Sequence, residues 1–276
     1  MDNIVQEIIL KAQKDVFSNN LGTHLTPFKG EGIDFEEIKE YSIGDDIRKI
    51  NWNATAKDPF GTLQINQFND ERELNIIIAF MVSGNISFGS QILKQDIMNQ
   101  ILAILAYSSI KNNDRYHTVF FSNKIEKEYY PTKNFNLLEN IISYGVKLDP
   151  LKKEINWGNF CYFINSLKKK SIIFIIGDFF EDNIDLSSIA YKNDVYSLIV
   201  RDRLEEDISF SGEYDLIDPI SLKTNQQILN NTIISNYKKL LIEHDNKLIE
   251  HFLNYKIKYT KIYTHDNIFS KLTSIM

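Results

Sequence analysis

The sequence predicts an α/β protein with a doubly wound, mostly parallel sheet covered by helices on both faces, preceded by a small N-terminal module. Residues 74–81 form a continuous apolar run, as expected of a central strand buried on both sides. Strand-like and helical patterns then alternate, which is typical of right-handed βαβ crossovers. A chain of 276 residues with 43% hydrophobic content can bury one large core and an appendage.

The first seventy residues contain one helix and a segment of mixed character. Apolar residues with helical spacing predict an amphipathic helix over residues 3–18 that packs on something larger. Residues 21–31 are rich in glycine and predict a loop, and residues 33–41 are either extended or a short helix. Residues 62–68 alternate like a half-exposed strand. A charged break at 70–73 sets the predicted boundary between an N-terminal part, 1–70, and an α/β domain, 71–276.

The α/β domain is predicted to alternate in a regular order after its first strand. We expect strands at 118–122, 125–130, 171–176, 195–200 and 257–263. We expect helices at 94–110, 134–144, 157–167, 187–191 and 232–253, and a short helix at the C-terminus.

Charge and composition exclude several classes of protein. A net charge of -6 argues against a mainly electrostatic nucleic-acid binder, which needs a basic surface. The longest apolar runs, 76–82 and 172–176, are far shorter than the ~18 to 20 residues that cross a bilayer. No apolar stretch follows Met1 as in a secretory signal, and the single Cys161 excludes an internal disulfide. We therefore expect a cytoplasmic protein without direct membrane insertion.

The most distinctive stretch is the signature segment, residues 28–68. Nine consecutive positions within it contain Gly44, Asp45, Asp46, Arg48 and Trp52. A structural interpretation is a glycine turn, an acidic helix start, an internal carboxylate–guanidinium pair that docks this module on the sheet, and a tryptophan that anchors packing. A second interpretation is a contact surface or an acid site. A metal-dependent hydrolase using Asp45 and Asp46 would need further converging carboxylates or histidines, and none is nearby in sequence.

The signature segment resembles the "domain of unknown function 58" family. The matching residues are Gly30, Gly32, Phe35, Lys39, Tyr41, Gly44, Asp45, Asp46, Arg48, Ile50, Trp52 and Ala56. Asn51 departs from the aspartate usual in the family. The likeness continues downstream through Phe88-Gly89-Ser90, Lys94, Asp114, Phe121-Ser122, Asp178-Phe179, Asp202 and Tyr237. It implies a von Willebrand factor A (vWA)-like domain that is usually encoded beside a MoxR-type AAA+ ATPase.

Two loops are expected at the carboxyl ends of the strands, where ligands bind in open α/β sheets. In vWA domains such loops hold a metal-ion-dependent adhesion site whose first loop reads Asp-x-Ser-x-Ser. The resemblance aligns this pattern with Met81, Ser83 and Asn85. Thioether sulfur is a poor ligand for hard Mg²⁺, and residues 147–159 lack the threonine of a second loop.

We therefore expect a metal-free or very weak site with no Mg²⁺ cofactor. Ser83, Asn85 and Asp178 are the residual ligand candidates, and their alternative role is to cap loops and helix starts. We interpret the loops as a partner-binding rim formed by Ser83, Asn85, Ser87 and Asp178.

The leading hypothesis is a non-enzymatic adaptor that works with a MoxR-type AAA+ ATPase and presents a client protein for remodelling. The sequence has no P-loop, no Gly-x-Ser-x-Gly elbow and no His-Glu-x-x-His motif. The alternatives are a metal-dependent hydrolase using the Asp45/Asp46 cluster and a scaffold protein that acts without an ATPase.

Overall fold

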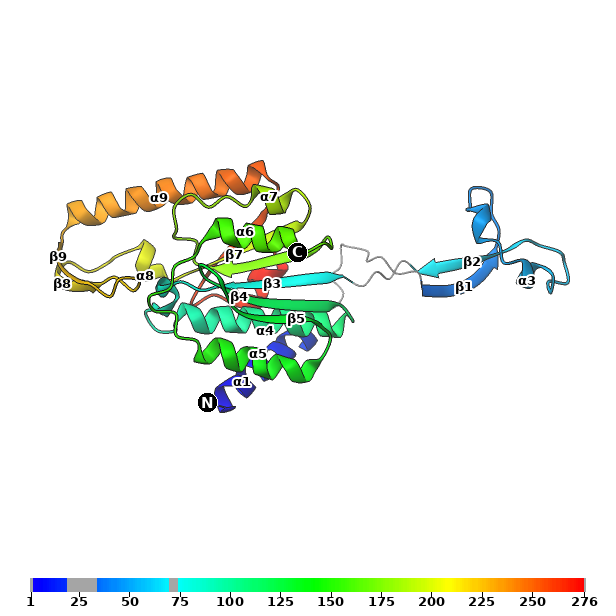
Figure 1. The fold of residues 1–276 in the computed structure, drawn as a ribbon, viewed down its shortest axis with the longest axis horizontal. Helices are drawn as coiled ribbons and strands as arrows, with labels where there is room; N and C mark the ends of the chain where they lie inside the picture. Colours follow the sequence, from blue (N-terminus) through cyan, green and yellow to red (C-terminus); the bar gives the residue numbers. More distant parts are fainter. Residues whose placement is uncertain (1, 19–33, 70–73, 276) are drawn as a thin grey trace. The chain divides into compact units, whose positions relative to one another are not determined.

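A computed structural model of the chain describes residues 2–18, 34–69 and 74–275 (Figure 1). The predicted loop at 21–31, with Gly30 and Gly32, lies outside the described residues. Contacts divide the chain into a large unit, Met1–Leu25 with Asn75–Met276, and a small unit, Thr26–Leu74. The N-terminal helix α1 (Asp2–Ser18), which the sequence analysis grouped with the signature segment, packs on helices of the large unit.

The large unit is built on a six-stranded sheet with the order β10-β7-β6-β3-β4-β5. Its strands are β3 (Asn75–Met81), β4 (Arg115–Phe121), β5 (Ile125–Thr132), β6 (Ile172–Gly177), β7 (Asp194–Arg201) and β10 (Lys258–Tyr263). All neighbours are parallel except β5, which runs antiparallel to β4. The predicted doubly wound, mostly parallel α/β fold is confirmed.

Strand order reverses between β3 and β6. From β3 the chain proceeds to β4 and β5 on one side, and from β6 it proceeds to β7 and β10 on the other. The two strands are hydrogen-bonded neighbours, with Ile78 paired to Phe174. Loops that leave such neighbours in opposite directions open a crevice at their carboxyl ends, which is where open α/β sheets bind ligands.

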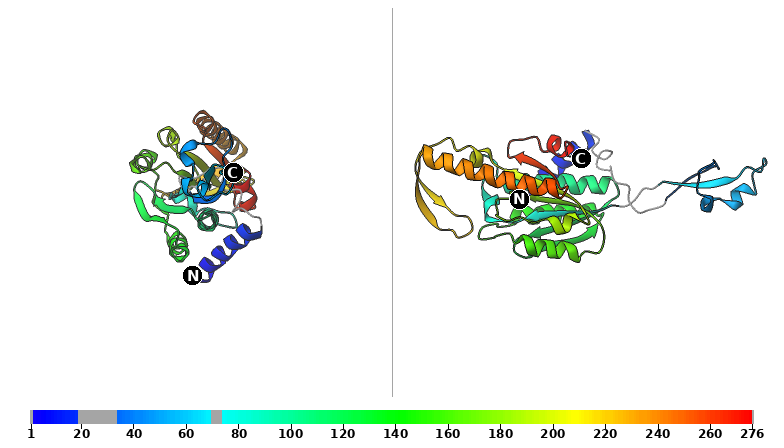
Figure 2. Two further views of the ribbon diagram at one scale, coloured as in Figure 1. Left: turned by 90° about the vertical axis from the view of Figure 1, so that its right-hand side faces the viewer. Right: turned by 90° about the horizontal axis from the view of Figure 1, so that it is seen from above.

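Helices cover both faces of the sheet, as two views of the large unit show (Figure 2). One face carries α4 (Lys94–Lys111), α5 (Phe135–Lys147), α10 (Ile268–Thr273) and α1. The other carries α6 (Trp157–Ser166), α7 (Ser187–Ala190) and α9 (Asn231–Asn254). Alternate residues of β3 face opposite sides of the sheet. Ile77, Ala79 and Met81 accordingly belong to the core beneath α6, α7 and α9.

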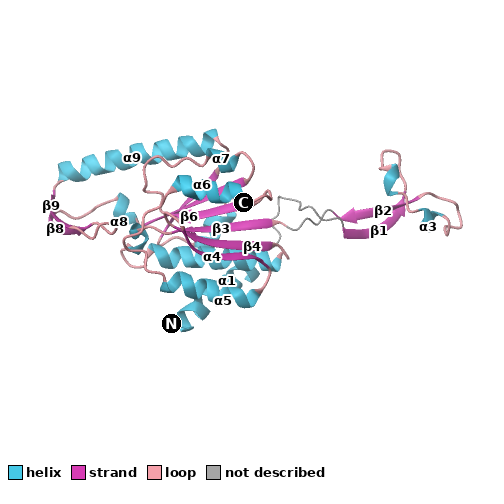
Figure 3. Cartoon of the chain, in the orientation of Figure 1, coloured by secondary structure: helices cyan, strands magenta, loops and turns pink. Residues whose placement is uncertain are grey.

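Two elements of the large unit were not predicted. They are the short helix α8 (Arg203–Glu206) and an antiparallel hairpin of β8 (Gly212–Ile217) and β9 (Thr224–Leu229). The hairpin has no alternating core pattern because nearly all its residues are exposed. It leads directly into α9, which begins at the end of the unit where the hairpin lies and runs from there along the unit (Figure 3).

The hairpin tip folds back over the carboxyl ends of the strands. The amide of Lys152 donates a hydrogen bond of 3.0 Å to the carbonyl of Pro219 at the tip. Gly84, in the 3₁₀ turn η2 (Gly84–Ser87), leaves room for this approach. A Cβ at Gly84 would lie 2.6 Å from the Pro219 carbonyl oxygen. The glycine is therefore required by a close contact between two backbones.

The small unit is a two-stranded antiparallel sheet with two short helices. Strand β1 (Asp34–Glu40) pairs with β2 (Gln64–Asn69), and the connection contains the 3₁₀ turn η1 (Ile47–Lys49) and α3 (Trp52–Thr55). The predicted strand at 62–68 is confirmed, and residues 33–41 are extended from residue 34 on.

Candidate functional site

The glycine turn of the signature segment has the predicted backbone conformation. Gly44 has φ of +111°, a backbone conformation that is unfavourable for residues that carry a Cβ. The carboxylate of Asp45 accepts hydrogen bonds from the Ser42 amide at 2.9 Å and from Lys39 Nζ at 3.3 Å. The Ser42 hydrogen bond is the main reason that the pKa of Asp45 is lowered.

Asp46 and Arg48 form the predicted internal pair. Asp46 caps η1 by accepting from the Arg48 amide, and its carboxylate also accepts from Arg48 Nε at 3.0 Å and from Nη2 at 2.9 Å. These hydrogen bonds lower the pKa of Asp46. The Arg48 side chain is 87% exposed, so this pair shapes the turn and leaves a charged surface toward solvent.

Two neighbouring positions behave differently from expectation. Trp52 is 67% exposed, so the expected packing anchor is wrong within the small unit, because its helix α3 is only one turn long. Asn51 caps α3 through its side-chain oxygen, which accepts from the Ala54 amide at 2.9 Å, while its amide donates to Asn66. Asparagine and aspartate are equally good caps, which explains why this departure from the family pattern is tolerated.

The acid cluster does not gather further ligands in the part of the chain that is described. Asp45 and Asp46 are each held by a cation of their own turn, Lys39 and Arg48. Among the described residues, no group of three or more His, Cys, Asp or Glu side chains is placed to hold a metal ion. The arrangement thus offers local charge pairing rather than the convergent carboxylates that a two-metal hydrolase uses.

The predicted rim at the top of the sheet divides into buried and accessible residues. Ser83 and Asp178, two members of the predicted partner-binding rim, are completely buried and do not reach the surface: they follow β3 and β6 beneath the connecting loops. Asn85 and Ser87 line a cavity. The Ser83 hydroxyl and one oxygen of Asp178 have no hydrogen-bond partner among the described residues.

A buried lysine holds the two sides of this crevice together. The Nζ atom of Lys94 lies 2.6 Å from a carboxylate oxygen of Glu205 and 3.3 Å from one of Asp178. The Lys94 side chain has no exposed area, and its ammonium lies 5.0 Å from the centre of the Phe180 ring. Burial raises the pKa of Glu205, although the charge of Lys94 opposes that effect.

Sequence analysis noted Lys94 only as a family match and missed its role. One local signal was present: Lys94 is the first residue of α4, where the helix dipole disfavours a cation. A lysine at that position needs a compensating carboxylate, but Glu205 and Asp178 become its neighbours only when the sheet assembles.

The donor set at this position does not fit the divalent cation of a vWA adhesion site. Met81, which stands where the first carboxylate is expected, is fully buried in the apolar core. Asp178 already faces the ammonium of Lys94. Magnesium requires a near-octahedral set of hard oxygen ligands, whereas here a lysine side chain supplies the positive charge.

A second buried cation fixes the loop after β6. Arg201 donates from Nε to the Asp178 carbonyl at 2.6 Å, and its guanidinium carbon lies 3.5 Å from the centre of the Phe180 ring. It pairs with Asp245 at 3.4 Å. Burial alone would raise the pKa of Asp245, but hydrogen bonds from His244 and Lys261 hold it well below its usual value.

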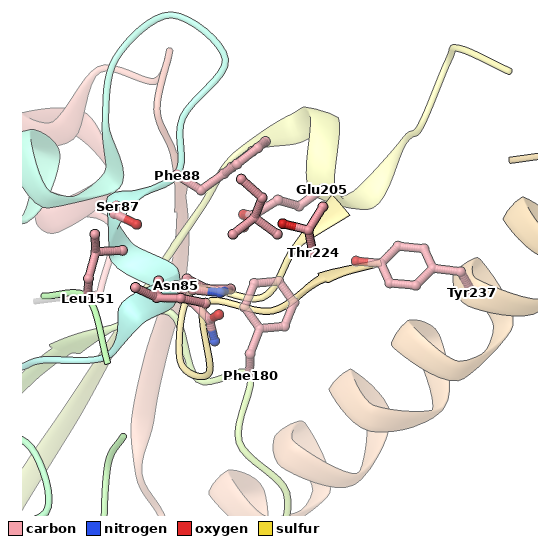
Figure 4. A pocket seen from close by; sticks show the side chains of 11 residues that line it. Asn85, Ser87, Phe88, Leu151, Phe180, Glu205, Thr224 and Tyr237 are labelled. Atoms are coloured by element: carbon pink, nitrogen blue, oxygen red, sulfur yellow. The ribbon is translucent and has the colours of Figure 1, made fainter. Parts of the chain in front are cut away.

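Directly above these groups lies a cavity of about 760 Å³ (Figure 4). The loop after β3, the loop after β6, α8, the hairpin tip and α9 enclose it. Its lining residues are Asn85, Ser87, Phe88, Leu151, Phe180, Glu205, Ile217, Pro219, Leu222, Thr224 and Tyr237. Glu205 is the one charged member of this set. Tyr237 reaches in from α9 with its hydroxyl directed toward Thr224 (Figure 4).

Comparison with known proteins identifies the family. Residues 37–247 match the family model described as "Protein of unknown function DUF58". The chain belongs to the DUF58 family. No curated protein matches it. None of the helices in the described part of this DUF58 protein has the length and apolar character needed to span a membrane.

Solved structures match the chain at low similarity. The protein BatB from Bacteroides thetaiotaomicron, described as a conserved hypothetical protein, is 13% identical with a TM-score of 0.47. An aerotolerance-related membrane protein from Bacteroides fragilis, carrying mutations to serine, is 14% identical with a TM-score of 0.47. In both comparisons the match covers 73% of this chain and 96% of the other.

Proposed function

We propose that this DUF58 protein is a non-enzymatic, cytoplasmic adaptor whose sheet-top cavity takes a segment of a partner protein. The observation that carries the proposal is the position and lining of the cavity. It lies at the reversal of strand order, and apolar side chains from the hairpin and α9 form much of its wall. Concave, mostly apolar sites with a few polar groups are the usual form of binding sites.

An exposed apolar surface next to the cavity supports the same function. We call it the apolar arm and define it as the exposed hydrophobic residues of the hairpin together with three exposed residues from one side of α9: Tyr214, Leu216, Ile217, Leu222, Ile228, Ile233, Tyr237 and Leu240. In α9 the arm follows helical spacing, since 233, 237 and 240 share one side. Apolar surface gathered in one place marks an interaction site.

The partner that we propose is a MoxR-type AAA+ ATPase, with a client protein that the adaptor presents to it. This partner follows from the family resemblance. The exposed Asp46–Arg48 turn of the small unit supplies a second, charged contact surface in this scheme. Binding through the cavity requires no catalytic group in the DUF58 chain.

Co-purification of the full chain with a MoxR-type AAA+ ATPase from the same organism tests the proposal. Association is measured without nucleotide, with ADP and with a non-hydrolysable ATP analogue. Leu222→Asp places a charge in the cavity wall, whereas Leu253→Asp introduces the same change at the other end of α9, on a residue that is also exposed. We expect the first variant to lose the complex and the second to retain it.

Two results would count against the adaptor. A native chain that fails to associate in every nucleotide state removes the ATPase as a partner. If Leu222→Asp and Leu253→Asp bind the ATPase equally well and both keep the melting temperature of the unmutated chain, the cavity is not the contact surface.

A further inference from the structure

We propose that the cavity recognises a basic side chain, lysine or arginine, on the partner segment. This inference rests on the proposed function and adds the chemistry of the recognised group. It rests on two observations: the pairing of the charged groups beneath the cavity, and the accessibility of one of these groups to a partner.

The groups beneath the cavity carry an excess of negative charge. One ammonium, that of Lys94, serves two carboxylates, Asp178 and Glu205. The two other cations nearby are balanced by two acids: Asp245 lies 3.4 Å from Arg201 and 2.6 Å from Lys261, and Glu206 lies 2.7 Å from Lys261. The cluster of Lys94, Asp178 and Glu205 therefore retains one uncompensated negative charge.

Accessibility decides which of these charges a partner meets. The side chains of Lys94 and Asp178 have no exposed area, whereas that of Glu205 is 13% exposed and lines the cavity. A carboxylate from a partner cannot reach the ammonium of Lys94. The charged group that remains accessible to a partner is therefore an acid, Glu205.

The cavity walls suit a cation with an apolar stem. Phe88, Phe180 and Tyr237 all line it, and aromatic faces attract ammonium and guanidinium groups. Phe180 already lies against Arg201 and Lys94, so Tyr237 is the aromatic ring best placed for an incoming cation. Thr224 and Tyr237 also line the cavity, and their hydroxyls can hydrogen-bond to the backbone of a bound segment.

The test uses three blocked pentapeptides, acetyl-Ala-Leu-Xaa-Leu-Ala-amide, in which Xaa is lysine, norleucine or glutamate. Each is titrated into the full chain while backbone amide NMR signals of the cavity residues are followed. We expect the lysine peptide to bind at least tenfold more tightly than the norleucine peptide and the glutamate peptide to bind most weakly. Added salt should reduce the advantage of lysine.

Glu205→Gln identifies the responsible group. Glutamine can still accept the Asp202 amide hydrogen bond that closes the capping box of α8. We expect this variant to bind the lysine and norleucine peptides within threefold of each other. Glu213→Gln is the matched control, because Glu213 is an exposed residue of the hairpin outside the cavity lining. If the Glu205 variant does not fold, Tyr237→Leu should weaken the lysine peptide several-fold and spare the norleucine peptide.

The possible outcomes separate the two proposals. Equal affinity for the three peptides, or a preference for glutamate, overturns the basic specificity and leaves a segment-binding cavity in place. Retention of the lysine preference in the Glu205 variant also overturns it. If no peptide shifts the cavity signals, the proposed binding function itself is contradicted.

Discussion

The ammonium of Lys94 lies 2.6 Å from a carboxylate oxygen of Glu205, although 111 residues separate the two in the sequence. Helix α4 begins at Lys94, after the loop that follows β3, and Glu205 belongs to α8, directly after β7. The sheet brings both to its carboxyl edge, and Asp178 reaches the same ammonium from the end of β6. One buried cation thus joins three connections of the fold.

Replacing that cation should destabilise the large unit. Lys94→Met preserves much of the side-chain volume but leaves Asp178 and Glu205 without their counterion. Removing one partner of a buried ion pair typically costs about 3–5 kcal/mol, and we expect that loss in the free energy of unfolding measured with urea. Lys169→Met, at an exposed position, should change it by less than about 0.5 kcal/mol.

A second substitution checks the cause of that loss. Asp178→Asn should recover part of the stability in the Lys94→Met background, because it removes a charge that has lost its partner. If the double variant loses as much free energy of unfolding as Lys94→Met and Asp178→Asn lose in sum, the pairing of Lys94 with Asp178 has no measurable energetic role.

Glu181 should make stability depend on pH. Burial, and then the charge of Asp178, raise the pKa of Glu181 from 4.5 to about 7. Between these values the unfolded chain releases a proton that the folded chain keeps, so this group lowers stability as pH rises from 4.5 to 7 and has its full effect above 7. We expect Glu181→Gln to be more stable than the native chain at pH 8, by up to about 3 kcal/mol.

Urea unfolding at pH 4, 6 and 8 measures this effect. The stability advantage of the glutamine variant should vanish at pH 4, because Glu181 of the unmutated protein is then largely protonated in the folded and in the unfolded state alike. Glu154→Gln provides an exposed control. An advantage of the Glu181 variant that is the same at all three pH values would show that it has another cause.

The hairpin tip should depend on the absence of a side chain at Gly84. Gly84→Ala introduces a Cβ 2.6 Å from the Pro219 carbonyl oxygen, closer than real contacts allow, so the tip must move away. We expect faster hydrogen exchange at the Lys152 amide, which donates to that carbonyl, and across β8 and β9.

A second glycine serves as the comparison for that experiment. Gly158→Ala in α6 meets only an ordinary contact of 3.4 Å with Asn156 and should leave exchange in the hairpin unchanged. If the Lys152 amide exchanges as slowly in Gly84→Ala as in the unmutated chain, the hairpin tip does not pack on the turn at Gly84.

The Asp46–Arg48 turn should matter for association rather than for folding. Because the Arg48 side chain is 87% exposed, Arg48→Gln should leave the melting temperature unchanged and confine NMR shift changes to residues 42–52. If this turn contacts the ATPase, the same variant should reduce co-purification, whereas Lys57→Gln, at another exposed position of the small unit, should not. A lowered melting temperature would instead assign the pair a structural role.

Much of the fold could be predicted because its elements have strong local patterns. The apolar run of β3 and the helical spacing of α9 place both within a few residues of their observed bounds. The hairpin escaped prediction because it lies outside the core and its strands are almost entirely exposed. Its tip packs on the turn at Gly84, a contact between distant segments that no local pattern encodes.

The candidate site was only partly predictable for the same reason. The positions of Ser83 and Asp178 after adjacent strands were correctly expected at the carboxyl edge, but their burial was not, because the loops that cover them come from distant parts of the chain. Trp52 shows the opposite case, since a large aromatic residue was expected to pack and is exposed within the small unit.

The sequence by itself determined the α/β class, the order of the main elements and the DUF58 membership. Periodicity and motif spacing are local properties, so they can be read before folding. Only the tertiary structure decided that Lys94 supplies the positive charge beneath the cavity and that Glu205 is the acid facing it. Those relationships depend on which distant segments the sheet brings together, and therefore on packing rather than on any one stretch of chain.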